Sequence, residues 1–157
     1  MLFGKRRRHV KRILIVEDEP LVAFYNEIMV SGAGYQVVAT VDTVADALAV
    51  LARELGGNNG NEERGVDLIL TDVSLAGQRN GIDLAREAGK RGVPTLFATA
   101  EPPEGADQLA LGVLLKPYNE RRLKAALRAV EQMLAGKARV AAPEGVLLYP
   151  PTRTAED

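Results

Sequence analysis

Short aliphatic runs alternate with segments of helical periodicity along the whole chain, and this alternation constrains the fold most strongly. The runs lie at residues 13–16, 35–41, 66–71, 93–98 and 113–115. Each is as long as a buried strand and is followed by a turn or by polar residues. Strands that alternate with helices build parallel sheets through right-handed crossovers, so the pattern predicts an α/β fold with helices on both faces of one sheet.

Helical patterns fill the intervals between these runs. The first opens with Pro20, which suits a first helical turn, and its apolar residues recur at helical spacing: Leu21, Phe24, Tyr25, Ile28 and Met29. Further helices are predicted over residues 43–55, 81–90 and 119–134. Any helix over 104–111 should be short and weak, because Pro and Gly precede it. Residues 56–65 hold four Gly and three Asn and predict a flexible loop.

Length and charge suggest three parts. The 157 residues suit one domain of roughly 100–150 residues, predicted over 12–135. Residues 1–11 form a basic arm. The first twelve residues carry six of the 20 basic residues and no acid, which leaves 14 basic against 21 acidic residues, a net charge of −7, on the rest. Residues 136–157 form a Pro- and Ala-rich tail, which either packs along the surface or is disordered; its apolar patch at 146–149 leaves docking open.

Composition excludes several classes of protein. The chain has no Cys, which removes disulfides and thiolate zinc sites. Its low aromatic content of 4% and its acidic body disfavour nucleic-acid partners. No uncharged run is long and apolar enough to span a bilayer or to serve as a signal peptide. We therefore expect a cytoplasmic protein without a membrane span.

Polar residues follow the predicted strands at their carboxyl ends, where open parallel sheets bind ligands. They are Glu17, Asp18, Asp72, Thr99 and Lys116. Carboxylates suit Mg²⁺ in the company of phosphate oxygens, and a carboxylate can attack phosphorus to form an aspartyl phosphate. An ammonium and a hydroxyl can orient the phosphoryl oxygens. Each residue alone is weak evidence, but together they predict phosphoryl chemistry.

Five motifs carry a family resemblance. They are Leu-Ile-Val-Glu-Asp-Glu-Pro at 14–20, Asp-Leu-Ile-Leu-Thr-Asp-Val-Ser-Leu at 67–75, Gly-Ile-Asp-Leu-Ala at 81–85, Phe-Ala-Thr-Ala at 97–100 and Leu-Leu-Lys-Pro-Tyr at 114–118. Over residues 12–135 the chain closely resembles the receiver domain of bacterial two-component response regulators. The resemblance implies a flavodoxin-like, doubly wound sheet of five parallel strands in the order 2-1-3-4-5.

The resemblance also implies a role for each site residue. Asp72 corresponds to the phosphoacceptor. Glu17 and Asp18 correspond to the acidic pair, with Asp18 the direct Mg²⁺ ligand, and the backbone carbonyl of Ser74 completes the protein ligands. Thr99 corresponds to the residue that binds a phosphoryl oxygen.

Lys116 corresponds to the residue that pairs with the phosphate, and the peptide between Lys116 and Pro117 is often cis in this family. The segment Phe-Ala-Thr at 97–99 further resembles an alphaproteobacterial subgroup named for a Phe-Ala-Thr-Gly motif, with Ala100 in place of Gly. Val113 stands where most receivers carry an aromatic residue that turns inward on phosphorylation. We expect either that Val113 simply packs or that the Pro-rich segment 101–111 is the moving part.

The leading interpretation is a stand-alone response regulator that takes a phosphoryl group onto Asp72 from a sensor histidine kinase or a histidine phosphotransfer protein. It is not a metabolic enzyme and catalyses its own phosphorylation and dephosphorylation. Because little chain follows residue 135, we expect it to signal as a monomer or weak dimer through an unknown protein partner or through a phosphorelay.

Two alternatives remain. A receiver-like interaction module that signals without phosphorylation draws support from Val113 and Ala100. A phosphohydrolase of the haloacid dehalogenase type needs a second acid two residues after its nucleophile, where this chain has Ser74.

Overall fold

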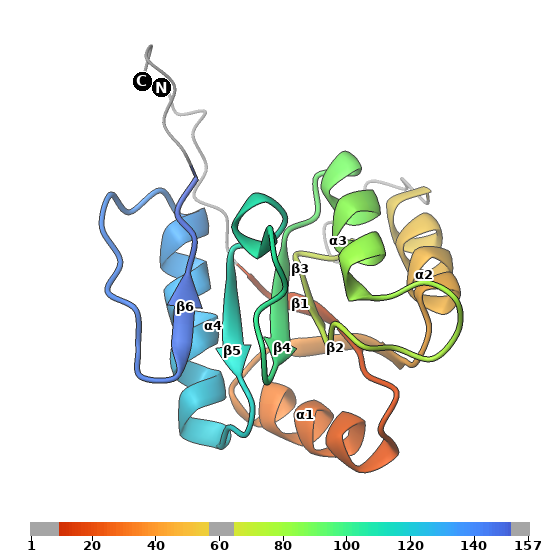
Figure 1. The fold of residues 1–157 in the computed structure, drawn as a ribbon, viewed down its shortest axis with the longest axis horizontal. Helices are drawn as coiled ribbons and strands as arrows, with labels where there is room; N and C mark the ends of the chain where they lie inside the picture. The colour runs from red at the N-terminus through yellow and green to blue at the C-terminus, as the bar shows by residue number, and fades with distance from the viewer. Residues whose placement is uncertain (1–9, 57–64, 152–157) are drawn as a thin grey trace.

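The computed structural model describes residues 10–56 and 65–151, and its strands and helices alternate along the chain (Figure 1). The strands are β1 (Arg12–Val16), β2 (Gln36–Val41), β3 (Leu68–Thr71), β4 (Thr95–Thr99), β5 (Gly112–Leu115) and β6 (Val146–Leu148). The helices are α1 (Pro20–Gly32), α2 (Val44–Gly56), α3 (Gly81–Lys90) and α4 (Glu120–Leu134), with a 3-10 turn, η1 (Ala106–Gln108). Most of the basic arm and of the glycine-rich loop lies outside the described residues.

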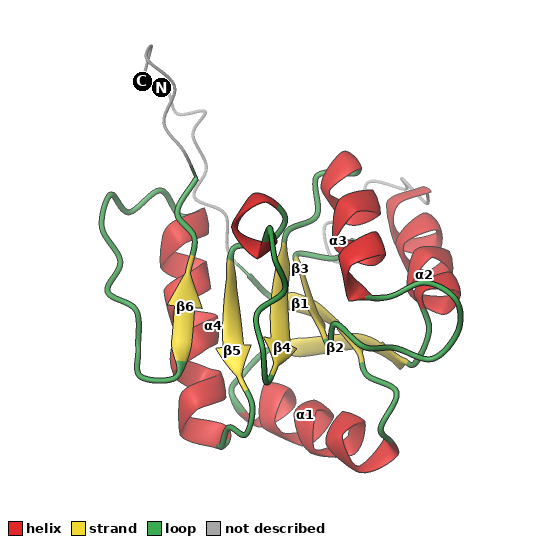
Figure 2. Ribbon diagram, in the orientation of Figure 1, coloured by secondary structure: helices red, strands yellow, loops and turns green. Residues whose placement is uncertain are grey.

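The strands form one six-stranded sheet in the order β2-β1-β3-β4-β5-β6 (Figure 2). The first five are parallel, which confirms the predicted order 2-1-3-4-5. The sixth pairs antiparallel with β5 and extends the expected five-stranded sheet by one strand. It comes from the tail, which therefore packs on the body over the residues that the structure describes.

Helices cover both faces of the sheet because side chains alternate along each strand. On β1, Ile13 and Ile15 face α1 and α4, where they meet Val30 and Leu123. The intervening Leu14 and Val16 face α2 and α3. These two apolar layers hold the sheet rigidly between the helices, so the strand ends are fixed relative to one another.

The segment between β4 and β5 carries only the short turn η1, in agreement with the weak helix that the sequence predicts. Over this segment lies a third apolar cluster that includes Phe97, Ala106 and Val113, with Tyr149 of the tail packed against it. Val113 is fully buried there.

Helix α1 turns an apolar stripe to solvent. Leu21, Phe24, Tyr25 and Ile28 are each 52–69% exposed, whereas Asn26 lies buried beneath them. A helix that is apolar on most sides can bury only one of them against a sheet. Within the described residues, no helix is both long and apolar enough to cross a membrane.

Candidate functional site

Glu17 and Asp72 lie side by side because they follow adjacent parallel strands. Val16 and Thr71 are register partners on β1 and β3. The Asp72 N–H donates to the carbonyl of Val16 at 3.1 Å, which continues the ladder by one more bond. The pairing of the two central strands thus places both carboxylates at the same edge of the sheet.

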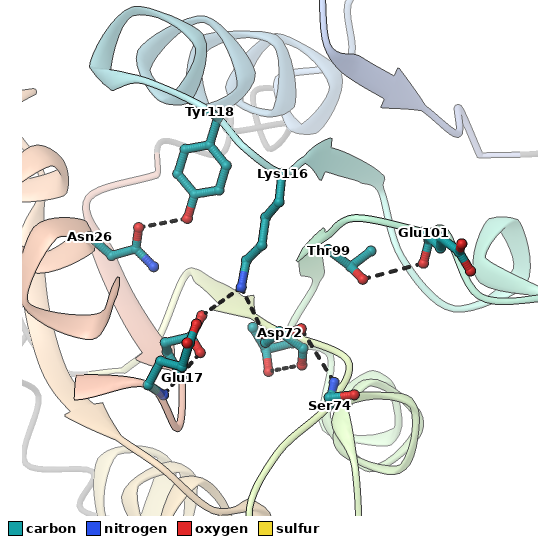
Figure 3. A network of polar contacts seen from close by, with 10 residues as sticks. Glu17, Asn26, Asp72, Ser74, Thr99, Glu101, Lys116 and Tyr118 are labelled. Carbon is teal, nitrogen blue, oxygen red and sulfur yellow. Dashed lines mark hydrogen bonds and ion pairs between the residues drawn. The ribbon is translucent and has the colours of Figure 1, made fainter. Parts of the chain in front are cut away.

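Lys116 connects these two carboxylates (Figure 3). Its Nζ donates to Glu17 Oε1 at 3.0 Å and to Asp72 Oδ2 at 2.8 Å. Its backbone N–H donates to the carbonyl of Thr99 at 3.0 Å, which ties the end of β5 to the end of β4. The peptide between Lys116 and Pro117 is cis.

Burial and hydrogen bonding act in opposite directions on this network. Burial raises the pKa of Glu17, whose side chain is 1% exposed, and the hydrogen bond from Lys116 only partly offsets that rise. Burial alone would lower the pKa of Lys116, but its hydrogen bonds to Asp72 and Glu17 outweigh it, so the pKa lies above its usual value. The ammonium of Lys116 is therefore held in its charged form.

Three acidic residues meet at this edge. Glu17, Asp18 and Asp72 each offer one carboxylate oxygen, and these oxygens lie within 4.8 Å of one another. Asp18 is exposed, so this side of the cluster is open to solvent. Three hard oxygen donors on an accessible edge fit a divalent cation such as Mg²⁺, which retains water and takes few protein carboxylates.

The structure places the other two predicted residues at the rim of this cluster. The Ser74 N–H donates to Asp72 Oδ1 at 3.3 Å. Thr99 ends β4, and its hydroxyl donates to the carbonyl of Glu101 at 3.3 Å (Figure 3). The Thr99 hydroxyl is thus engaged with the following loop.

Sequence reasoning missed a second polar contact beside the site. The Tyr118 hydroxyl donates to Asn26 Oδ1 at 2.6 Å (Figure 3), and burial raises the pKa of Tyr118 to about 12. This bond ties α1 to the segment directly after Lys116. The available signal was Asn26 itself, a polar residue within an otherwise apolar part of a helix.

Gly81 lies directly against the backbone of Asp72. A Cβ at this first position of α3 would collide with the backbone carbonyl of Asp72. The helix begins there because the Asn80 side chain accepts from the Ile82 and Asp83 N–H groups in a capping box. The absence of a side chain at Gly81 lets this helix start directly against the loop that carries Asp72.

The family model of the response regulator receiver domain matches residues 13–128 of the chain. The chain belongs to this family. The match spans the network of Glu17, Asp72 and Lys116 and places the receiver within two-component signalling. The expected resemblance is therefore confirmed, together with the α/β fold.

Two curated relatives agree with this assignment. The receiver is 35% identical over 91 residues to the phyllosphere-induced regulator PhyR of Methylorubrum extorquens, which covers 57% of this chain and 31% of that protein. It is 33% identical over 147 residues to the sensory transduction protein RegX3 of Mycolicibacterium smegmatis, and this match covers 90% of this chain and 59% of RegX3. The chain thus spans 31% and 59% of the lengths of these two curated relatives.

A solved structure shows the same fold over nearly all of its own length. The BeF3-activated conformation of SdrG from Pseudomonas melonis Fr1 is 32% identical to the receiver, with a TM-score of 0.61. The comparison covers 78% of this chain and 98% of SdrG.

Proposed function

We propose that this receiver accepts a phosphoryl group on Asp72 in a Mg²⁺-dependent reaction and acts as a response regulator in the cytoplasm. One observation carries the proposal: Lys116 contacts Asp72 and Glu17 at once, at an edge where three carboxylates converge. A purely structural ion pair has no need of the third, exposed carboxylate of Asp18.

Glu17, Asp18 and Asp72, with the backbone carbonyl of Ser74, would hold Mg²⁺. The bound ion supplies positive charge to the oxygens of the transferring phosphoryl group. Lys116 supplies a second positive charge from the side of β5, and the Thr99 hydroxyl binds a phosphoryl oxygen after leaving the carbonyl of Glu101. Asp72 provides the oxygen that bonds to phosphorus as the phosphorus–nitrogen bond of a phosphohistidine breaks, and the electron pair of that bond stays on the imidazole.

The phosphodonor docks on α1. A phosphohistidine that reaches Asp72 must approach the carboxyl edge of the sheet, where α1 begins three residues after Glu17. From that end, Leu21, Phe24, Tyr25 and Ile28 form an exposed apolar stripe. An exposed apolar stripe of this kind fits the apolar face of a partner helix, so we infer that the donor is a helical domain of a histidine kinase or a histidine phosphotransfer protein.

The test is phosphorylation of the receiver by a small phosphodonor and by a cognate kinase. Asp72→Asn abolishes labelling by both. Phe24→Ser reduces transfer from the kinase at least about tenfold and leaves transfer from the small donor unchanged, because the stripe contacts only a protein donor. Label retained by Asp72→Asn at the wild-type level contradicts the assignment of the acceptor.

The alternative is an interaction module that signals without phosphorylation, and it draws on Val113, which is buried in place of the usual aromatic residue. It predicts equal partner binding by the wild-type receiver and by Asp72→Asn. In the alternative the signal passes only through binding to a protein partner, whereas a phosphorylated receiver can also pass its phosphoryl group to a phosphotransfer histidine. The receiver turns over no metabolite in this scheme.

A further inference from the structure

The tail covers the edge of β5 along its whole length. Strand β6 pairs with β5 from Gly112 to Leu114. Beyond this ladder, the Tyr149 N–H donates to the carbonyl of Leu111 at 2.8 Å, and the Leu115 N–H donates to the carbonyl of Gly145 at 2.9 Å. Strand β6 thus lies beside β5 (Figure 2). Because Leu115 directly precedes Lys116, the tail is bound to the strand that leads into this lysine.

The tail also contacts the segment that leads away from Thr99. Tyr149 packs against the cluster of Phe97, Ala106 and Val113, and Ala106 belongs to η1. Thr99 and Lys116 therefore bracket a stretch of chain whose turn and strand both rest against the tail. The chain between these two residues is therefore in direct contact with the tail.

Among the described residues of the tail, only Val146 is buried in the core, and Leu148 packs against the same cluster. Val146 is 5% exposed, whereas Leu147 is 38% exposed. The ion pair of Arg122 with Glu144 at 2.9 Å contributes little, because the Glu144 side chain is 85% exposed. Residues 135–145, which connect α4 to β6, form no helix or strand. Strand β6 can therefore leave while the five parallel strands keep all their own pairings.

We propose that β6 is a strap that lies on β5 while Asp72 is free and is released when a phosphoryl group occupies the site; this inference rests on the proposed function. The Thr99 hydroxyl now donates to the carbonyl of Glu101. A phosphoryl oxygen that takes over this hydroxyl frees the loop after Thr99, which shifts η1 and removes the surface on which Tyr149 rests. By thermodynamic reciprocity, release of the strap raises the affinity of the site for a phosphoryl group by the same factor.

Gly112 offers a selective way to release the strap. A Cβ at this position would collide with the carbonyl of Leu147 and would touch the side chain of Leu148, so its nearest neighbours all belong to β6. Gly112→Ala therefore opposes docking of the strap without a clash in the parallel sheet. Gly89→Ala is the matched control, because a Cβ there meets nothing within 4 Å.

A second variant acts through a side chain. Tyr149→Ala removes the contact with the cluster over η1. Its matched control is Leu147→Ala, which truncates an exposed side chain on β6, two residues before Tyr149. Agreement between Gly112→Ala and Tyr149→Ala excludes an effect of backbone strain in β5.

The experiment measures the affinity of the full chain for beryllofluoride, a mimic of the phosphoryl group, with Mg²⁺ present. Gly112→Ala and Tyr149→Ala bind it roughly fivefold or more tightly than wild type, while both controls bind as wild type does. In the wild-type receiver, saturating beryllofluoride accelerates amide exchange of Tyr149 and Leu115 by about the same factor. The amide of Ile69, which donates to the carbonyl of Pro94 in the parallel sheet, keeps its rate.

The experiment distinguishes a failure of the strap proposal from a failure of the proposed function. Beryllofluoride binding that is equal or weaker in both variants, or unchanged exchange at Tyr149 and Leu115, overturns the strap and leaves phosphorylation of Asp72 in place. Failure of the wild-type receiver to bind beryllofluoride overturns the proposed function and the strap with it.

Discussion

Lys116 and Glu17 form an ion pair at 3.0 Å between residues 99 positions apart in sequence, and the Glu17 side chain is 1% exposed. A carboxylate buried this deeply needs its partner, because an isolated charge in the interior is strongly disfavoured. The second bond of Lys116, to Asp72, makes the same ammonium part of the proposed acceptor site. Stability and function of the receiver therefore depend on one side chain.

Lys116→Met tests the structural role of this side chain. The variant loses about 1–3 kcal/mol of unfolding free energy at neutral pH, because Glu17 keeps a buried charge without its partner. The loss shrinks toward acidic pH, since protonation of Glu17 removes that charge in the folded state. Chemical unfolding across this pH range checks the prediction. Lys124→Met, which removes an ion pair with Glu120 on the surface of α4, serves as control and changes stability by less than about 0.5 kcal/mol.

Asp18→Asn tests the metal site without disturbing the core, because Asp18 is exposed. We expect Mg²⁺ affinity to fall roughly tenfold or more while stability without Mg²⁺ is unchanged or slightly higher, since fewer like charges remain. Calorimetric titration with Mg²⁺ measures the change. The control is Asp42→Asn, an exposed acid outside the cluster; equal losses in the two variants would argue against a site built on Asp18.

Tyr118 makes the unfolding free energy of the receiver depend on pH in the alkaline range. Its pKa is raised from 10.0 to about 12, so the folded state keeps the phenol proton that the unfolded state loses first. The stabilisation is complete below pH 10 and is lost as pH rises to about 12. Tyr118→Phe is less stable than wild type at neutral pH, because Asn26 loses its hydrogen bond, and the difference narrows in this alkaline window. Unfolding curves with phenolate absorbance provide the measurement; a constant difference at all pH values contradicts it.

Gly81→Ala forces the start of α3 away from the Asp72 backbone. We expect a loss of about 1–3 kcal/mol in unfolding free energy and weaker binding of beryllofluoride. Gly89→Ala lies in the same helix and meets no neighbour, so it stabilises by about 0.5–1 kcal/mol. Thermal unfolding of the pair provides the check. Similar behaviour of the two variants would show that space beside Asp72 is unimportant.

The order of elements and the edge that carries the site follow from local sequence. Four-residue apolar runs such as the one at 13–16 specify buried strands, and the polar residue after each run comes to the carboxyl edge of a parallel sheet. Glu17, Asp72 and Lys116 were expected together for this reason, and the structure brings them into contact. The distances between these three side chains could not be predicted, because they depend on the register in which the strands pair.

Other features depended on partners far away in the chain. Helix α1 is apolar on most sides, so its periodicity alone could not decide that Phe24 and Ile28 face solvent. The apolar patch at 146–149 is too short to specify a strand by itself. It becomes β6 because β5, about 30 residues earlier, presents an unpaired edge with a glycine at 112 where the two backbones come close.

The sequence by itself determined the five parallel strands, the carboxyl edge and the chemistry of the residues on that edge, because hydrophobic periodicity and side-chain type are local properties. Only the tertiary structure decided that Lys116 contacts both Glu17 and Asp72, that the Thr99 hydroxyl donates to the carbonyl of Glu101, and that the tail adds a sixth strand to the sheet. Those contacts depend on the free energy of packing and pairing between distant segments, which local patterns do not contain.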